Sequence, residues 1–177
     1  VVASINDKTS LIFLANPNNP TGTHIPQATM NDLLDRIPAH VVVVYDEVYY
    51  QFAEAEDYRT GVDYVRAGHQ LIGVNSFSKA YGLGGLRVGY LYSSSKLANY
   101  IRQVRRPFML NTLTQEGAMA ALTDTEHIKR TVHLIQSEKP KFYKILNELN
   151  VKHWPSQANF ILLKPDMNDE IFTVKML

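Results

Sequence analysis

Short apolar runs alternate along the chain with segments of helical periodicity. Four of these runs predict strands, at residues 11–15, 41–45, 71–75 and 87–92. Residues 41–45 are four valines and a tyrosine without polar alternation, which is typical of a strand covered on both faces. Strands that alternate with helices predict an α/β fold with a mainly parallel sheet.

Apolar residues at helical spacing predict helices at residues 27–36, 96–106, 114–122 and 126–150. Pro140 should kink or interrupt the last of these helices. Residues 157–163 then predict a strand, and the residues from 168 onward predict another helix. Because the strand–helix alternation stops after about residue 124, we expect a large domain at residues 1–124. Residues 125–177 would form a connecting helix and the start of a smaller domain.

The composition argues against several classes of protein. The 177 residues are 45% hydrophobic and 20% charged, and the net charge of +1 argues against binding to nucleic acid or an anionic membrane. The longest apolar runs have about five residues where a spanning helix needs ~20, so no membrane segment is expected. The lack of cysteine is compatible with a reducing cytoplasm. The chain opens without methionine or a signal peptide, and we expect it to be a piece of a longer protein.

Asp46 directly follows the valine-rich run. We therefore expect its carboxylate at the carboxyl end of a buried strand, where a charge needs a partner. Ligands of parallel α/β folds bind at this edge of the sheet. A helix N-cap or a structural ion pair would explain the position of Asp46 equally well.

Lys79 ends the sequence Ser-Phe-Ser-Lys, just past the third predicted strand. If the extended conformation persists, Ser76 and Ser78 project to the same side. Together with Arg87, eight residues after the lysine, the two hydroxyls would form a phosphate site. Taken alone, this segment is better explained as a surface lysine after a serine-rich turn.

The remaining motifs are less informative. Residues 16–22 form a loop with two prolines that would hold Asn18 or Asn19 rigidly over the strand ends. The glycines at residues 82–85 match neither the P-loop nor the dinucleotide fingerprint. The six histidines lack the spacing of metal ligands, and we expect no metal site.

These features nevertheless occur in a specific order: an Asn-rich loop, a strand-end aspartate with a tyrosine three residues later, Ser-x-Ser-Lys, and an arginine. This order resembles the fold type I pyridoxal-phosphate enzymes, the aspartate aminotransferase superfamily. Residues 16–22 (NPNNPTG) and 76–90 (SFSKAYGLGGLRVGY) are most similar to its histidinol-phosphate aminotransferase branch. The resemblance implies part of the mainly parallel large-domain sheet with its flanking helices, and the start of an α+β small domain.

The resemblance also implies roles for individual residues. Lys79 matches the lysine that holds pyridoxal 5'-phosphate covalently and then acts as general acid and base. Asp46 matches the carboxylate that pairs with the pyridine nitrogen. Asn19 and Tyr49 match the groups that hydrogen-bond the phenolic oxygen of the cofactor. The phosphate anchors correspond to Ser76, Ser78 and Arg87.

The implied activity is that of an aminotransferase. It would move an amino group between an amino acid or amine, such as histidinol phosphate, and a 2-oxo acid by a ping-pong route. A lyase or decarboxylase on the same scaffold and a catalytically incompetent fragment are the alternatives. Family members are about twice this long and usually homodimers, so their ring-stacking aromatic residue and substrate-carboxylate arginine would lie outside this chain. Residues 107–110 depart from the histidinol-phosphate branch, which leaves the substrate open.

Overall fold

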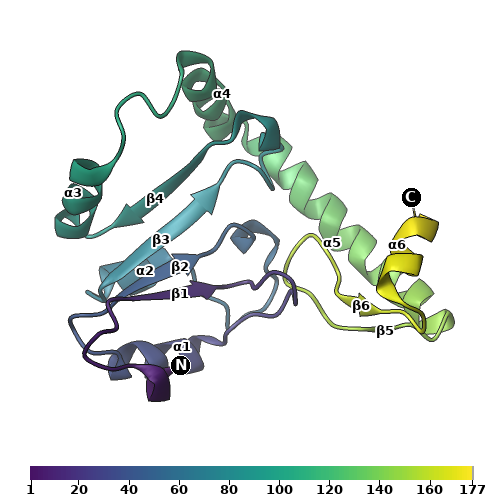
Figure 1. The fold of residues 1–177 in the computed structure, drawn as a ribbon. Helices are drawn as coiled ribbons and strands as arrows, with labels where there is room; N and C mark the ends of the chain where they lie inside the picture. The colour runs from purple at the N-terminus through teal and green to yellow at the C-terminus, as the bar shows by residue number, and fades with distance from the viewer. Residues whose placement is uncertain (177) are drawn as a thin grey trace.

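The computed structural model describes residues 1–176, which contain a four-stranded sheet (Figure 1). The strands are β1 (Leu11–Ala15), β2 (Val42–Asp46), β3 (Leu71–Ser76) and β4 (Gly89–Ser93). They lie in the order β1-β2-β3-β4, with the first three parallel and β4 antiparallel to β3. The predicted α/β fold with a mainly parallel sheet is therefore confirmed. The fourth strand starts two residues later than predicted, because Arg87 adopts a left-handed conformation with φ 52°.

One face of the sheet packs against two helices, α1 (Gln27–Arg36) and α2 (Gly61–Arg66). Their contact with the sheet forms a core of six buried side chains: Met30, Leu34, Val43, Tyr45, Tyr64 and Leu71. The helix α1 has the predicted bounds. The helix α2 was not predicted, because six residues are too few for a clear periodic pattern.

The opposite face of the sheet is much less buried, so the prediction that residues 41–45 are covered on both faces is wrong for the part of the chain described. Val43 and Tyr45 are buried, whereas Val42 and Val44 between them are only half-buried. On the neighbouring strand β1, Leu11 and Phe13 are exposed. The period-two alternation of strand side chains therefore separates a covered face from an open one.

Three helices follow the sheet: α3 (Ser95–Val104), α4 (Thr112–Thr123) and α5 (Thr125–Glu148). Each begins after a polar residue whose side chain accepts a hydrogen bond from a backbone N–H of the first turn: Ser94, Asn111 and Asp124 respectively. Pro140 does not interrupt α5, contrary to one of the two predicted outcomes. A proline removes only one backbone N–H from a helix. Side-chain contacts hold α5 on both sides of this position, since Ile135 packs against a buried cluster before it and Tyr143 stacks on His153 after it.

The C-terminal part forms a short hairpin and a helix beside the far end of α5 (Figure 1). The hairpin pairs β5 (Lys152–His153) with β6 (Leu163–Lys164), and α6 (Asp169–Met176) follows as predicted. The strand predicted at residues 157–163 is wrong, because only Leu163 lies in a strand. Gln157 instead donates its backbone N–H to the Gly22 carbonyl, which draws this segment away from the hairpin.

Short 3-10 helices complete the fold: η1 (Val2–Ser4), η2 (Tyr50–Phe52) and η3 (Gly84–Leu86). The helix η2 follows β2 closely, and η3 lies at the end of the glycine-rich stretch before β4. Within residues 1–176, no helix combines the length and the apolar character that a membrane crossing would require.

Candidate active site

The carboxyl ends of the three parallel strands meet at one edge of the sheet. In the register of the sheet, Asp46 lies between Ala15 of β1 and Val74 of β3. The segments that leave these strands carry the residues singled out from the sequence. This is the edge at which parallel α/β folds bind their ligands.

Tyr49 connects two other predicted residues at this edge. Its hydroxyl accepts a hydrogen bond of 3.1 Å from the side-chain amide of Asn19. The Lys79 amine lies over the Tyr49 ring, 5.3 Å from its centroid. Asn19, Tyr49 and Lys79, each at least 30 positions from the others in the sequence, are thus brought together. Lys79 and Asn19 are exposed, and Tyr49 is buried.

The Tyr49 ring is fixed from behind by a second buried cluster. Tyr49 is 5% exposed and packs edge-on against Phe160 at a centroid distance of 5.2 Å. Phe52, Ala80 and Ala158 complete the cluster, and the first half of α5 packs against it. The position of the tyrosine is therefore set by apolar packing from three regions of the chain.

The Asn19 loop is held down by the residue at its start, Asn16, which is fully buried. The Asn16 side chain donates to the Tyr45 hydroxyl at 2.5 Å and accepts from the Ile25 backbone at 2.8 Å. The loop contains two cis X–Pro peptide bonds, at Pro17 and Pro20. Asn18, the other candidate, donates its side-chain amide to the Thr21 hydroxyl within the loop at 2.8 Å.

The Lys79 turn is anchored by Phe77, which is buried between aromatic neighbours. Its ring lies 4.8 Å from that of Tyr81 and 5.7 Å from that of Tyr90, measured between centroids. Its backbone N–H donates to Val88 at 3.1 Å. Lys79, two residues later in this turn, is exposed at the sheet edge.

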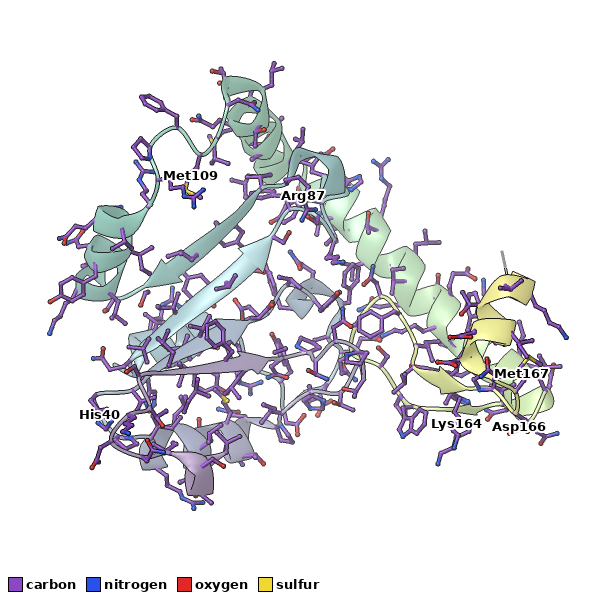
Figure 2. All side chains as sticks on the ribbon, viewed as in Figure 1. His40, Arg87, Met109, Lys164, Asp166 and Met167 are labelled. Atoms are coloured by element: carbon purple, nitrogen blue, oxygen red, sulfur yellow. The ribbon has the colours of Figure 1, made fainter. Side chains whose placement is uncertain are left out.

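The two serines are close, but not in the predicted way. The strand β3 ends at Ser76, so the extended conformation does not persist to Ser78. The Ser78 backbone N–H instead donates to the Ser76 hydroxyl at 3.0 Å, which forms a turn. Arg87 lies at the same end of the sheet (Figure 2), where its guanidinium donates to the Gly84 carbonyl at 3.0 Å.

Asp46 lies at the predicted strand end but is exposed, and the expectation of a buried carboxylate is wrong. Its side chain accepts a hydrogen bond from the Val48 backbone N–H at 3.2 Å. The alternation that buries Tyr45 points Asp46 to the open face of the sheet. Its charge therefore does not need a protein partner to offset burial.

The buried carboxylate at this edge belongs to the next residue, Glu47, which was not predicted to be a site residue. Burial raises the pKa of Glu47, while hydrogen bonds from Tyr92, Gly61 and Asn75 oppose that shift. An available signal was Gly73 in the middle of β3, since a glycine inside a strand often marks a close approach of another group. Among residues 1–176, no group of three or more side chains could hold a metal ion.

Comparison with known proteins identifies the family. The sequence profile described as "Aminotransferase class I and II" matches residues 2–174. The chain belongs to the class I and II aminotransferases. This covers almost the whole chain, including the loop of Asn19 and the turn of Lys79.

The aminotransferase chain is similar to curated histidinol-phosphate aminotransferases. It is 40% identical over 164 residues to histidinol-phosphate aminotransferase 2 of Carboxydothermus hydrogenoformans, covering 92% of this chain and 45% of that protein. It is 38% identical over 173 residues to the histidinol-phosphate aminotransferase of Geobacillus thermodenitrificans, covering 97% and 47%. The chain spans about half the length of the curated relatives that it matches.

Solved structures share the fold of the aminotransferase chain. Histidinol-phosphate aminotransferase from Sinorhizobium meliloti, in complex with pyridoxal-5'-phosphate, superimposes with a TM-score of 0.81 at 28% identity, covering 89% of this chain and 43% of that one. L-threonine-O-3-phosphate decarboxylase from Porphyromonas gingivalis gives a TM-score of 0.78 at 27% identity, covering 94% and 51%. The predicted likeness to fold type I enzymes is confirmed.

Proposed function

We propose that this chain carries the cofactor-binding part of a pyridoxal-phosphate-dependent aminotransferase. The whole protein would transfer an amino group between an amino acid or amine and a 2-oxo acid, with histidinol phosphate as the first amine to test. The observation that supports this most strongly is the contact of the Asn19 amide, the Tyr49 hydroxyl and ring, and the Lys79 amine at the sheet edge.

The chemistry of these side chains fits the functional groups of pyridoxal phosphate. The exposed Lys79 amine suits the aldehyde, and the Tyr49 hydroxyl with the Asn19 amide suits the phenolic oxygen. The exposed carboxylate of Asp46 suits a protonated ring nitrogen. The hydroxyls and guanidinium near the end of β3 suit the phosphate, namely Ser76, Ser78 and Arg87.

In this proposal, each side chain has a separate task. When bound, the cofactor supplies an electron-accepting ring that stabilises negative charge at the substrate carbon. The Lys79 amine attaches the cofactor and, once released by the substrate, carries a proton to or from that carbon. Asp46 holds the proton on the ring nitrogen. Tyr49 and Asn19 fix the orientation of the ring through its phenolic oxygen.

Covalent labelling tests the assignment of Lys79. The full-length protein is incubated with pyridoxal phosphate and reduced with borohydride, and the modified peptide is identified by mass spectrometry. We expect the label on Lys79, its loss in K79R, and no change in K96R, since Lys96 is exposed on α3 away from the sheet edge. Label distributed over surface lysines would refute the assignment. For the isolated 177-residue chain we expect weak cofactor binding and negligible turnover.

A decarboxylase is the second candidate, favoured by the structural likeness to L-threonine-O-3-phosphate decarboxylase. The same cofactor-binding residues can serve either reaction. Incubation of the cofactor-loaded protein with glutamate distinguishes the two. Lasting conversion of the cofactor to pyridoxamine phosphate supports amino transfer, whereas release of carbon dioxide from an amino-acid substrate supports the decarboxylase. If the full-length protein shows one of these reactions and the isolated 177-residue chain shows neither, the isolated chain is an incompetent fragment.

We also propose that the full-length protein is a homodimer in the cytoplasm. Support for the dimer comes from the segment between α3 and α4, where Phe108 is fully exposed and Met109 is 66% exposed (Figure 2 shows Met109 on this segment). Exposed apolar patches of this kind are typical of protein interfaces. Light scattering should give twice the mass of one chain, and F108D should lower it. The same change at the exposed Leu134 of α5 should not.

We further propose that the domain boundary lies near residue 124, where α4 ends and α5 begins. Some residues after this boundary contact the large domain. Ala158 is buried in the cluster around Tyr49, and Gln157 contacts the loop of Asn19. Limited proteolysis of the full-length protein tests this boundary, with cleavage expected near residue 124.

A further inference from the structure

The buried Glu47 carboxylate joins three separate elements to the end of β2. Glu47 is 1% exposed. It accepts a hydrogen bond of 2.8 Å from the Gly61 backbone at the start of α2 and one of 2.9 Å from the Asn75 amide on β3. It also accepts a hydrogen bond from the Tyr92 hydroxyl on β4. These three donors come from sequence positions up to 45 residues away.

Two glycines make room for the longest of these connections. The register of the sheet pairs Gly73 of β3 with Tyr92 of β4, so the Tyr92 side chain must cross β3 to reach Glu47 on β2. A Cβ atom at Gly73 would overlap the Tyr92 ring, and one at Gly61 would lie 2.6 Å from its hydroxyl oxygen. The absence of side chains at both positions therefore permits this crossing.

The orientation of Asn75 is also set by Glu47. Asn75 is 4% exposed, and its amide nitrogen donates to the carboxylate. Its side-chain oxygen has no hydrogen-bond partner among the residues described. The reversed amide would place the Asn75 side-chain oxygen against the Glu47 carboxylate oxygen. The hydrogen bond from the amide nitrogen to the negative charge therefore outweighs the cost of leaving the Asn75 oxygen without a donor.

Glu47 lies between two residues of the proposed cofactor site, Asp46 and Tyr49. Its backbone N–H donates to the Val74 carbonyl at 3.1 Å, and its carbonyl accepts from Tyr50 at 2.9 Å. The turn that leaves β2 is thus fixed by both the backbone and the side chain of one residue. Asp46 before it faces outward, and Tyr49 after it reaches Asn19 and Lys79.

We propose that Glu47 is a positioning residue of this site, which acts by holding the turn between Asp46 and Tyr49 in register with β3, β4 and α2. The inference rests on the proposed function, because it assumes that Asp46 and Tyr49 contact the cofactor. Glu47 itself contacts neither cofactor nor substrate in this arrangement. Its effect is on the affinity and the electronic environment of the bound cofactor.

The test compares three variants of the full-length protein. E47Q keeps the shape of the side chain and removes its charge, and Y92F removes one donor and keeps the ring. V43A is the control, because Val43 is 1% exposed on the same strand and contributes packing alone. Three quantities are measured: thermal stability, the dissociation constant for pyridoxal phosphate, and the pH titration of the visible absorbance of the bound cofactor. Hydrogen exchange of residues 46–50 is measured without cofactor.

E47Q is expected to weaken cofactor binding at least tenfold, to shift the absorbance titration, and to speed exchange of residues 46–50 at least tenfold. Y92F should do the same to a smaller extent. V43A should lower thermal stability and leave the dissociation constant within twofold of wild type. Equal losses of affinity in E47Q and V43A, or unchanged exchange in E47Q, would overturn the inference. If the wild type takes up no cofactor, the proposed function fails, and the exchange result alone decides whether Glu47 fixes the turn.

Discussion

Removal of the Tyr92 hydroxyl tests the physical argument around Glu47 through protein stability. Tyr92→Phe keeps the ring that fills the space over Gly73 and deletes one donor to a buried carboxylate. A hydrogen bond to a charged group contributes roughly 1.5–3 kcal/mol. Because two other donors to Glu47 remain, we expect the free energy of unfolding to fall by about 1.5–3 kcal/mol, as measured by urea denaturation at neutral pH.

Tyr64→Phe is a closely matched control. Tyr64 is 4% exposed in the core beneath the same sheet, and its hydroxyl has no hydrogen-bond partner among the residues described. Removing a buried, unpaired hydroxyl should leave stability unchanged or raise it by up to about 1 kcal/mol. Equal losses of stability in the two variants, or a Y92F variant as stable as the wild type, would contradict a stabilising hydrogen bond from Tyr92 to Glu47.

A double-mutant cycle then assigns the loss at Tyr92 to its partner. If the hydroxyl acts through Glu47, Y92F should cost much less in an E47Q background than in the wild type. Contacting residues in one network show coupling energies of about 0.5–3 kcal/mol, and we expect the upper half of that range. Additive losses would mean that the hydroxyl stabilises the protein by another route.

Other predictions follow from the same network and from Gln157. Burial raises the pKa of Glu47 above its ordinary 4.5. The stability that this raised pKa contributes is therefore full below pH 4.5 and is lost as the pH rises through the folded-state pKa. Urea titrations should show the wild type losing stability relative to E47Q as the pH increases, and a stability difference independent of pH would contradict this. Gly73→Ala should lower the free energy of unfolding by about 1–3 kcal/mol, because its Cβ overlaps Tyr92, whereas Gly85→Ala meets no atom within 4 Å and should change little in the same denaturation experiment. Gln157→Ala removes the side-chain oxygen that accepts from the backbone N–H groups of Glu54 and Ala55, after η2, at 2.7 and 2.9 Å. It should lower the free energy of unfolding by about 1–3 kcal/mol and speed the hydrogen exchange of these two groups. Unchanged exchange would show that these bonds are not needed to hold the segment.

The strands and long helices could be predicted because their patterns are local. The valine run of β2 and the spacing of apolar residues in α1 each specify an element without help from the rest of the chain. Residues 157–163 could not be predicted in this way. Their apolar composition favours a strand, but the hydrogen bonds of Gln157 with distant segments determine their conformation.

In the candidate site, too, some features could be predicted from the sequence and others could not. The contact of Asn19, Tyr49 and Lys79 was implied by the family resemblance, and the structure brings the three together. The burial of Asp46 was predicted wrongly because the valine run was expected to be covered on both faces. Alternation along β2 exposes Asp46 and turns Glu47 to the covered face. The hydrogen-bond partners that make burial of the Glu47 carboxylate possible come from distant segments that no local pattern connects.

The open face of the sheet has a consequence for work with the purified chain. Phe13 is 73% exposed and Leu11 is 51% exposed, and both lie on β1 at the edge of the sheet. An apolar surface at a free strand edge promotes self-association and aggregation. A dimeric mass measured on the isolated 177 residues could therefore arise from this face and not from the segment around Phe108. Phe13→Lys should abolish such an artefact and leave an association through Phe108 intact.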